Sequence, residues 1–316
     1  MSGGSVAPRP ASGNTHVIAF GAHRAVVGRV AAVLREYTVD GERVTESWPD
    51  DVVPPMGAGI VMAPWPNRIE DGSWTAPDGS HQQLDITEVA RNCAIHGLLR
   101  WTAYDIVEHS ESSILLSAEL HPQHGYPFSL DVTVRYTLSD NGLRVEHGVV
   151  NRGSEPAPFG VGAHPYFRLG ERPIADLTLT ISAQTHAFID ERWIPQGLAP
   201  VGEHGPDLRS GQKLGDVNCD ISLTDFAVVE SPAGPRHEHV LAADDGASVT
   251  VWTDPVFRWA QLYTPPKFPG YGPDQRLAIA IEPMTCNANA FRTGSDVLVV
   301  DPGESWSAAW GITAAL

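Results

Sequence analysis

The chain has 316 residues, and its 38 aspartates and glutamates outnumber the 21 lysines and arginines, which gives a formal net charge of -17. This acidic balance argues against binding to nucleic acid or to an anionic membrane surface, because both select for basic patches. No apolar run approaches the roughly 18–20 residues needed to cross a bilayer, and the N-terminus has no apolar signal core. We therefore expect a soluble, cytoplasmic protein.

The cysteines Cys93, Cys219 and Cys286 are odd in number and widely separated, and no CxxC spacing occurs. Neither a disulfide framework nor a thiolate zinc site is indicated. We expect three buried free thiols.

The N-terminal residues 1–14 are rich in Ser, Gly, Pro and Ala and have nothing to bury, so they predict a disordered lead-in. Residues 15–316 contain no composition break, linker or internal repeat, which favours a single domain. Near its start, the apolar spacing of the segment RVAAVLREYT, residues 29–38, fits a helix as well as a strand. Periodicity over so few residues does not decide between the two, and we favour the strand.

The clearest predicted element is the segment SLDVTVRYTLSDNGLRVEHGVV, residues 129–150, in which apolar and polar residues alternate before the turn residues Asp140, Asn141 and Gly142. Alternation of period two around such a turn predicts a β-hairpin with one wet face. Similar alternation or β-branched enrichment occurs at residues 112–120, 176–183, 247–252, 277–282 and 296–300. Many short strands indicate an all-β fold, either a sandwich or a barrel.

Four segments combine polar groups with Pro, Gly and aromatic neighbours in a way that ordinary strands do not. They are MAPWPNRIEDGSW at 62–74, AIHGLLRW at 94–101, GVGAHPYFRLG at 160–170 and AIAIEPMTCNANAF at 278–291. Glycine and proline fix the backbone where a side chain must be aimed, and aromatic rings offer flat apolar faces that suit the C–H faces of a sugar. This combination predicts a carbohydrate site.

Within these segments, His96, His164 and Glu282 are the candidates for chemistry. A lone histidine is more often structural than catalytic, and an acid paired with an arginine is an equally simple interpretation of Glu282. Together, however, a carboxylate and an imidazole tuned by burial supply a proton acceptor and a proton donor. We expect a rigid sheet to aim Glu282, the base, from a strand end, with Pro283 stopping the strand.

Other patterns give no support to further chemistry. The segment GVGAHP begins like a dinucleotide fingerprint but has Pro165 where the third glycine belongs, and it lacks a βαβ context. His237 and His239 in RHEHV share one strand face, as a metal pair would, but their Pro-, Gly- and acid-rich surroundings favour an exposed loop. Neither a GxSxG elbow nor a Walker A motif occurs, so acyl transfer and nucleotide hydrolysis are not indicated.

In chain order, the segments PWPNRI, HGLLRW, GAHPYFRLG and IEPMTCNANAF resemble the motifs of the aldose 1-epimerase (galactose mutarotase) family, and the likeness extends from about residue 15 to the closing PGESWSAAWGI. The resemblance implies a large β-sandwich that interconverts the α and β anomers of a free monosaccharide, without metal or organic cofactor. Residues 287–289 differ from the family's usual glutamate motif, where prolines and an aspartate are common, so no sugar preference is implied.

The resemblance also implies roles for five residues. Glu282 is the general base that takes the proton from the anomeric hydroxyl, and His164 is the general acid that protonates the ring oxygen. The ring then opens, the C1–C2 bond rotates, and reclosure gives the other anomer. Arg68 and His96 resemble the hydroxyl-binding partners, and Asp220 aligns with the sugar-binding aspartate.

Several alternatives stay open. Asp216 and Asp225 rival Asp220 as the sugar-binding aspartate. A hexose-6-phosphate 1-epimerase would need a basic cluster for a dianion, and apart from Arg168 and Arg292 only Arg68 and Arg100 lie near the site motifs. A non-catalytic carbohydrate-binding module would have the same architecture without turnover, although the presence of both the acid and the base argues against it. We expect a monomer or a homodimer, because no extended apolar surface is indicated.

Overall fold

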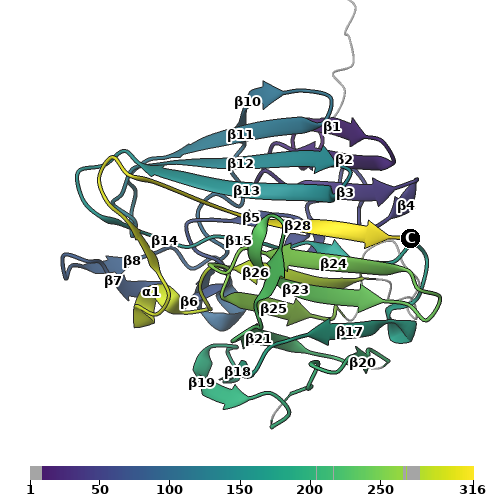
Figure 1. Ribbon diagram of the computed structural model, residues 1–316. Coiled ribbons are helices and arrows are strands. Elements are labelled where there is room, and N and C mark those ends of the chain that lie inside the picture. The colour runs from purple at the N-terminus through teal and green to yellow at the C-terminus, as the bar shows by residue number, and fades with distance from the viewer. Residues whose placement is uncertain (1–8, 204, 216, 266–267, 269–277) are drawn as a thin grey trace, which may run out of the picture.

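The computed structural model describes residues 9–203, 205–215, 217–265, 268 and 278–316. Most of its strands belong to two large sheets (Figure 1). The first sheet contains, in order across it, β10 (Asp105–His109), β11 (Ser113–Leu120), β12 (Leu130–Ser139), β13 (Gly142–Asn151), β28 (Ser305–Ala315), β24 (Ser248–Thr253), β23 (Gly234–Ala242), β17 (Thr178–Ile181) and β20 (Gln212–Lys213), with β22 (Val229–Ser231) beside β23.

The second sheet carries the residues of interest for function. Its order is β19 (Pro195–Pro200), β18 (Thr185–Ile189), β21 (Asp220–Thr224), β25 (Trp259–Tyr263), β26 (Ile279–Met284), β15 (Gly162–Ala163) and β5 (Val61–Met62), with β16 (Tyr166–Phe167) beside β26. Figure 1 shows β21, β25 and β26 in the same region as β23 and β24 of the first sheet. Apolar side chains of both sheets, among them Val251 and Ile281, belong to one buried cluster.

Smaller elements complete the fold. A four-stranded sheet contains β1 (Thr15–Phe20), β2 (His23–Gly28), β3 (Leu34–Val39) and β4 (Glu42–Arg43). Three strand pairs are β6 (Arg68–Glu70) with β9 (Cys93–Ile95), β7 (Ser73–Thr75) with β8 (His81–Gln83), and β14 (Ala157–Phe159) with β27 (Leu298–Val300). The short helices are α1 (Ala290–Thr293) and the 3-10 turns η1 (Pro55–Gly57), η2 (Val89–Arg91) and η3 (Ile174–Asp176).

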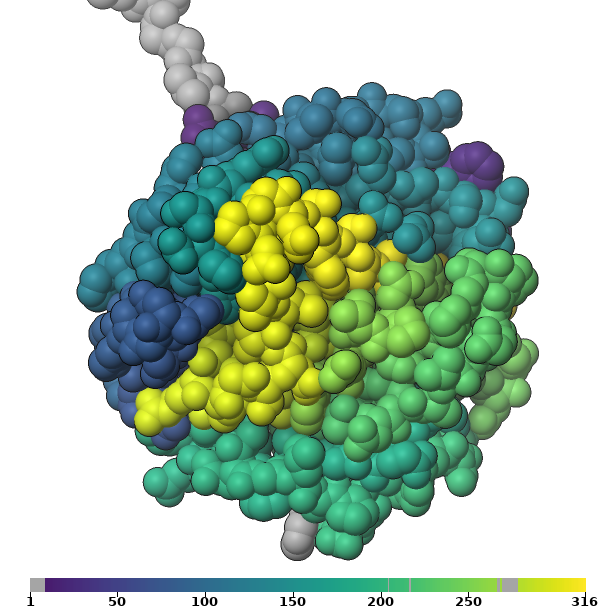
Figure 2. Space-filling model, turned by 60° about the vertical axis from the view of Figure 1, so that its left-hand side comes forward, coloured from purple at the N-terminus to yellow at the C-terminus, as the bar shows by residue number. Residues whose placement is uncertain are grey.

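The C-terminal strand β28 joins the two halves of the first sheet. It pairs with β13 on one side, with Val145 opposite Trp310, and with β24 on the other, with Thr253 also opposite Trp310. Figure 2 shows the C-terminal residues, in yellow, as a continuous band between the blue and teal segments and the green ones. Strand β28 therefore joins β13 and β24, which are far apart in the sequence, into one sheet.

The strands form where alternation or β-branched residues predict them. The β12–β13 hairpin pairs Ser139 with Gly142 across a two-residue turn, and buried residues alternate with half-buried ones along β12. The ambiguous segment 29–38 contains the start of a strand, because β3 begins at Leu34. All-β architecture is thereby confirmed, and no helix in the described ranges is long and apolar enough to cross a membrane.

Three expectations need correction. Residues 1–8 of the expected lead-in lie outside the described residues, but Ser12 is fully buried and its carbonyl accepts a hydrogen bond from the N–H of Val30, so packing begins before residue 15. His237 and His239 are buried within β23 and not on an exposed loop, because their side chains pack beside Phe226. Cys93 and Cys286 are buried free thiols, whereas Cys219 is only half-buried.

Candidate active site

Strand β26 has two different faces, and Glu282 belongs to the one that turns away from the space between the sheets. Ile279 and Ile281 belong to the main core cluster, whereas Ala280 and Met284 belong to a second, smaller cluster. Because side chains alternate along a strand, Glu282 shares the face of Ala280 and Met284. The same face continues across the sheet, with Gln261 of β25 opposite Glu282.

Strand β26 does not end at Glu282, so the expectation that Pro283 stops the strand is wrong. The strand runs on to Met284, and Pro283 pairs with Ala260. On the other side of β26, β16 pairs with Ala280 and β15 with Met284, and no pairing lies between them. A residue without an N–H is tolerated there because no hydrogen bond of the sheet needs it.

His164 lies in the gap between β15 and β16. The register on each side, with Gly162 opposite Met284 and Tyr166 opposite Ala280, places His164 opposite Glu282. Its Nε2 atom is 3.2 Å from Oε1 of Glu282, and its ring stacks on Tyr166 with the centroids 5.2 Å apart. Backbone hydrogen bonds to Gly59 and Ile60 hold the peptide on both sides of the ring.

His96 reaches the same place from the turn that follows β9. Its backbone has a φ of 62°, and its ring meets that of His164 edge to face at 5.4 Å. The next residue, Gly97, has a φ of 76°, and a Cβ there would lie 2.1 Å from the carbonyl oxygen of Ala63. Only glycine fits this close approach of two backbone segments. Gly97 therefore permits the turn that positions His96.

One cavity of about 460 Å³ is lined by all five residues that the sequence singled out, Arg68, His96, His164, Asp220 and Glu282. This volume lies within the range of small-molecule sites. The other lining residues are Pro54, Met56, Gly57, Ile60, Asn67, Thr87, Glu88, Ile95, Arg100, Trp101, Trp193, Gln261 and Tyr263. Within the described residues, no group of three or more His, Cys, Asp or Glu side chains is placed to hold a metal ion.

Arg68 is largely engaged within the protein. Its Nε and one terminal nitrogen donate to the two carboxylate oxygens of Glu88, at 2.6 and 2.9 Å, and the other terminal nitrogen donates to Oδ1 of Asn67. Glu88 also accepts from Arg91, whose guanidinium lies 3.4 Å from the ring centroid of Trp193. These contacts fix Arg68 at the cavity wall and leave it few free N–H groups.

Asp220 is held by Gln261. The side-chain amide of Gln261 donates to Oδ1 of Asp220, and its Oε1 accepts hydrogen bonds from Ser222 and from Asn67. Of the two rival aspartates, Asp216 lies outside the described residues. Asp225 is exposed and lines a different cavity, so of the two aspartates that the structure describes, Asp220 is the one at the site.

Burial shifts both members of the His164–Glu282 pair toward their uncharged forms. The pKa of Glu282 is raised well above its usual value, first by burial and then by the nearby Asp220, against the opposing effect of Arg68. Burial lowers the pKa of His164 to about 3. A carboxylic acid with a neutral imidazole holds the same number of protons as a carboxylate with an imidazolium, so one proton moving within the pair interconverts the two states.

Comparison with known proteins identifies the family of this chain. The sequence model of the family described as aldose 1-epimerase matches residues 22–313. The chain belongs to the aldose 1-epimerase family. The uncharacterized protein YihR of Escherichia coli K12 is 32% identical to it over 295 residues, which cover 93% of this chain and 91% of that protein.

Solved structures extend the comparison to the fold of this aldose 1-epimerase family member. The GalM/aldose epimerase homologue from C. elegans matches with a TM-score of 0.82 and 18% identity, over 96% of this chain and 99% of that one. A galactose mutarotase-like protein from Clostridium acetobutylicum matches with a TM-score of 0.81 and 19% identity, over 95% and 94% of the two chains. The fold is thus the large galactose mutarotase-type β-sandwich that the sequence predicts.

Several residues of the cavity in this aldose 1-epimerase family member escaped the sequence reasoning, chiefly Gln261, Asn67 and Trp193. The sequence does contain a signal that could have identified Gln261, because Gln261 is the polar residue between the apolar neighbours of WAQLY on a buried strand. No sequence pattern identifies Trp193, since it follows β18 in a turn, where its φ is 64°. The contact with Arg91 that fixes its ring joins distant parts of the chain.

Proposed function

We propose that this protein interconverts the α and β anomers of a free aldose, with Glu282 as general base and His164 as general acid. The observation that carries the proposal is the contact of 3.2 Å between these two side chains, both buried, at the wall of a cavity of small-molecule size. A carboxylate and an imidazole in this arrangement can reach the anomeric hydroxyl and the ring oxygen of one sugar together.

The proposed roles begin from the ion pair of a Glu282 carboxylate and a His164 imidazolium, which forms from the buried neutral pair when one proton moves from Glu282 to His164. Ring opening moves a proton from the anomeric hydroxyl to Glu282 and another from His164 to the ring oxygen, so it ends with a carboxylic acid and a neutral imidazole. Burial favours both of these uncharged forms. The carboxylate is therefore a stronger base, and the imidazolium a stronger acid, than either would be in water. Reclosure on the other face of the aldehyde reverses both transfers.

The remaining polar groups would bind the hydroxyls of the sugar. Asp220 offers an acceptor held by Gln261, and His96 has a buried Nδ1 atom without a hydrogen-bond partner. Buried polar atoms are normally satisfied, so the unpaired nitrogen of a histidine that lines the cavity is a candidate partner for a ligand hydroxyl. Trp101, which is 56% exposed, adds an apolar face at the cavity wall.

An epimerase of hexose 6-phosphates is the second candidate, and one residue favours it. Arg100 lines the cavity and donates to the carbonyl oxygen of Ile95, and no described carboxylate pairs with it. A phosphate dianion is usually bound by several cations. Arg68 is engaged by Glu88, so Arg100 stands nearly alone and the neutral aldose is the better fit.

The experiment that tests the proposal is anomer exchange followed by NMR on galactose, glucose, xylose and glucose 6-phosphate, with uncatalysed mutarotation subtracted. We expect exchange on a neutral aldose. Exchange on the 6-phosphate alone would select the second candidate. Sugar binding without exchange on any of the four would contradict both and favour a carbohydrate-binding module.

A further inference from the structure

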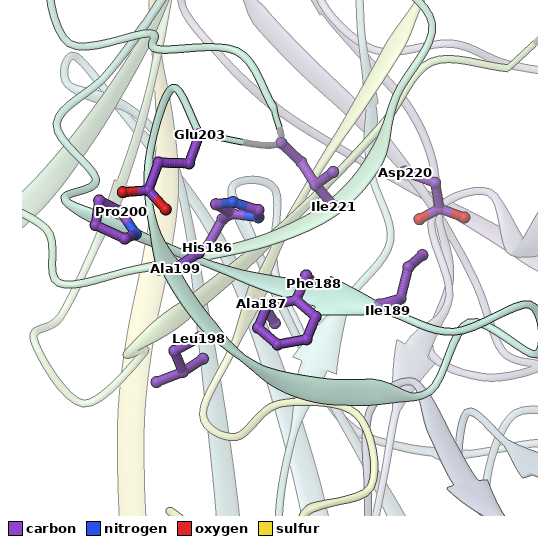
Figure 3. Close-up of a pocket in the computed structure, with 10 residues that line it drawn as sticks. All are labelled: His186, Ala187, Phe188, Ile189, Leu198, Ala199, Pro200, Glu203, Asp220 and Ile221. Atoms are coloured by element: carbon purple, nitrogen blue, oxygen red, sulfur yellow. The ribbon is translucent and has the colours of Figure 1, made fainter.

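A second cavity, of about 610 Å³, shares a lining residue with the candidate active site, and Figure 3 shows the residues that line this second cavity. Asp220 lines both cavities. The hairpin of β18 and β19 is a second link between them, because its turn brings Trp193 to the active-site cavity while its strands contribute Phe188 and Leu198 to the second cavity. A ligand that extends past Asp220 would enter the second cavity.

Asp220, the lining residue that the two cavities share, lies where β18 and β21 separate. The two strands pair only where Thr185–Ala187 lies opposite Ser222–Thr224. Beyond Ala187, β18 has a register irregularity against β19 at Phe188 and Ile189, whereas the start of β21 stays paired with β25. Figure 3 shows the Asp220 carboxylate pointing toward Ile189.

His186 is a buried polar residue of this cavity without a side-chain hydrogen-bond partner among the described residues. Its side chain is only 2% exposed, and neither ring nitrogen has a hydrogen-bond partner. In Figure 3 the imidazole lies between the side chains of Glu203 and Ile221. Buried polar groups in native proteins are normally satisfied by protein, water or ligand. A neutral imidazole donates at one nitrogen and accepts at the other, which matches a hydroxyl group.

The remaining wall combines apolar surface with carboxylates. Phe188, Ile189 and Leu198 are 40%, 36% and 58% exposed, and all three belong to the same hairpin. Figure 3 shows Glu203 and Asp220 at opposite ends of the cavity, with Phe188 between them. A sugar ring has apolar C–H faces and a rim of hydroxyls that donate to carboxylates, so this wall is complementary to a second sugar ring.

We infer that the second cavity is a subsite for a sugar ring linked glycosidically to the aldose in the active site, so that the preferred substrates are reducing disaccharides. The inference rests on the proposed anomer interconversion. The reacting ring would lie against Glu282 and His164, and the linked ring would pass Asp220 to contact Phe188 and His186.

The test compares anomer exchange on glucose with exchange on maltose, isomaltose and lactose, which all have glucose at the reducing end. We expect kcat/KM for at least one disaccharide to be tenfold or more above that for glucose. Phe188→Ala should lower the ratio of kcat/KM for that disaccharide to kcat/KM for glucose at least fivefold. Val107→Ala, a change at a residue that is 57% exposed on β10 and outside both cavities, should leave the ratio as in the wild type. Equal or lower kcat/KM for every disaccharide overturns the subsite.

A separate measurement keeps the failure of the subsite distinct from failure of the proposed function. Saturation-transfer difference NMR with the same disaccharides reports which ring contacts the protein whether or not turnover occurs. We expect transfer to protons of the non-reducing ring with the wild type, and its loss with Phe188→Ala. Transfer confined to the reducing ring, or none to either ring, contradicts the subsite. Glucose exchange that persists in that case leaves the proposed function standing.

Discussion

His164 and Glu282 face each other because strands on both sides of His164 pair with the strand that holds Glu282. Gly162 lies opposite Met284 and Tyr166 lies opposite Ala280, so the register between them puts the imidazole and the carboxylate together, with Nε2 and Oε1 3.2 Å apart. The sheet therefore fixes the proposed acid and the proposed base relative to one another before any ligand binds, which is the preorganisation that general acid–base chemistry requires.

The first prediction concerns stability and pH. Burial raises the pKa of Glu282 above its unfolded value of 4.5, so the folded state disfavours the carboxylate. The contribution of Glu282 to the free energy of unfolding is then fully present below about its unfolded pKa. It is lost as the pH rises through its folded pKa. Glu282→Gln cannot ionise, so its urea midpoint should match that of the wild type near pH 4 and exceed it at pH 8.

The control for this prediction is Glu111→Gln, because Glu111 is exposed. Its midpoint should follow that of the wild type at both pH values. A Glu282→Gln protein that is less stable than the wild type at pH 8 would show that the ionised carboxylate is stabilised by its neighbours, and not disfavoured by burial.

The second prediction concerns Gln261, which holds Asp220 and shares hydrogen bonds with Ser222 and Asn67. Gln261→Met is similar in size but removes these bonds, and a buried hydrogen bond to a charged group is worth about 1.5–3 kcal/mol. We expect kcat/KM for anomer exchange to fall roughly 10- to 100-fold, mainly through KM, because the role proposed for Asp220 is to bind the sugar and not to transfer protons. The exposed Gln123→Met is the matched control. Unchanged KM would argue that Asp220 holds its position without Gln261.

The third prediction concerns the turn that presents His96. In Gly97→Ala the new Cβ would meet the carbonyl oxygen of Ala63 at a backbone φ of 76°. The left-handed backbone and the overpacking together should cost roughly 2–5 kcal/mol of unfolding free energy. Gly79→Ala is the control, because Gly79 has a φ of 84° and no atom within 4 Å of an added Cβ. Equal losses in the two variants, measured by urea unfolding, would show that the clash is relieved by local movement.

The sequence predicts those parts of the fold and site that depend on local pattern. Alternation locates β12 and β13, and unusual Pro, Gly and aromatic surroundings single out His96, His164 and Glu282, which the fold brings to one cavity. The continuation of β26 through Pro283 is not visible in the sequence, because it depends on the unpaired stretch between β15 and β16. The burial of His237 and His239 is likewise decided by packing against Phe226, a residue on another segment.

The hydrogen bonds around Gln261 and the position of Trp193 could not be predicted from the sequence either. Each depends on a side chain from a distant part of the chain, Asn67 in the first case and Arg91 in the second. Single-sequence reasoning identifies candidate residues by type and local setting, but which of them share a cavity is determined by strand register.

The most direct test of the central claim is the rate of anomer exchange of Glu282→Gln, measured by NMR beside the wild type on the neutral aldose that the wild type turns over fastest. Removal of a general base typically costs 10²- to 10⁴-fold in rate. We expect a loss in that range for a variant that folds and still binds the sugar, with a comparable loss for His164→Gln. Wild-type exchange by a well-folded Glu282→Gln protein would contradict the assignment of Glu282 as the base.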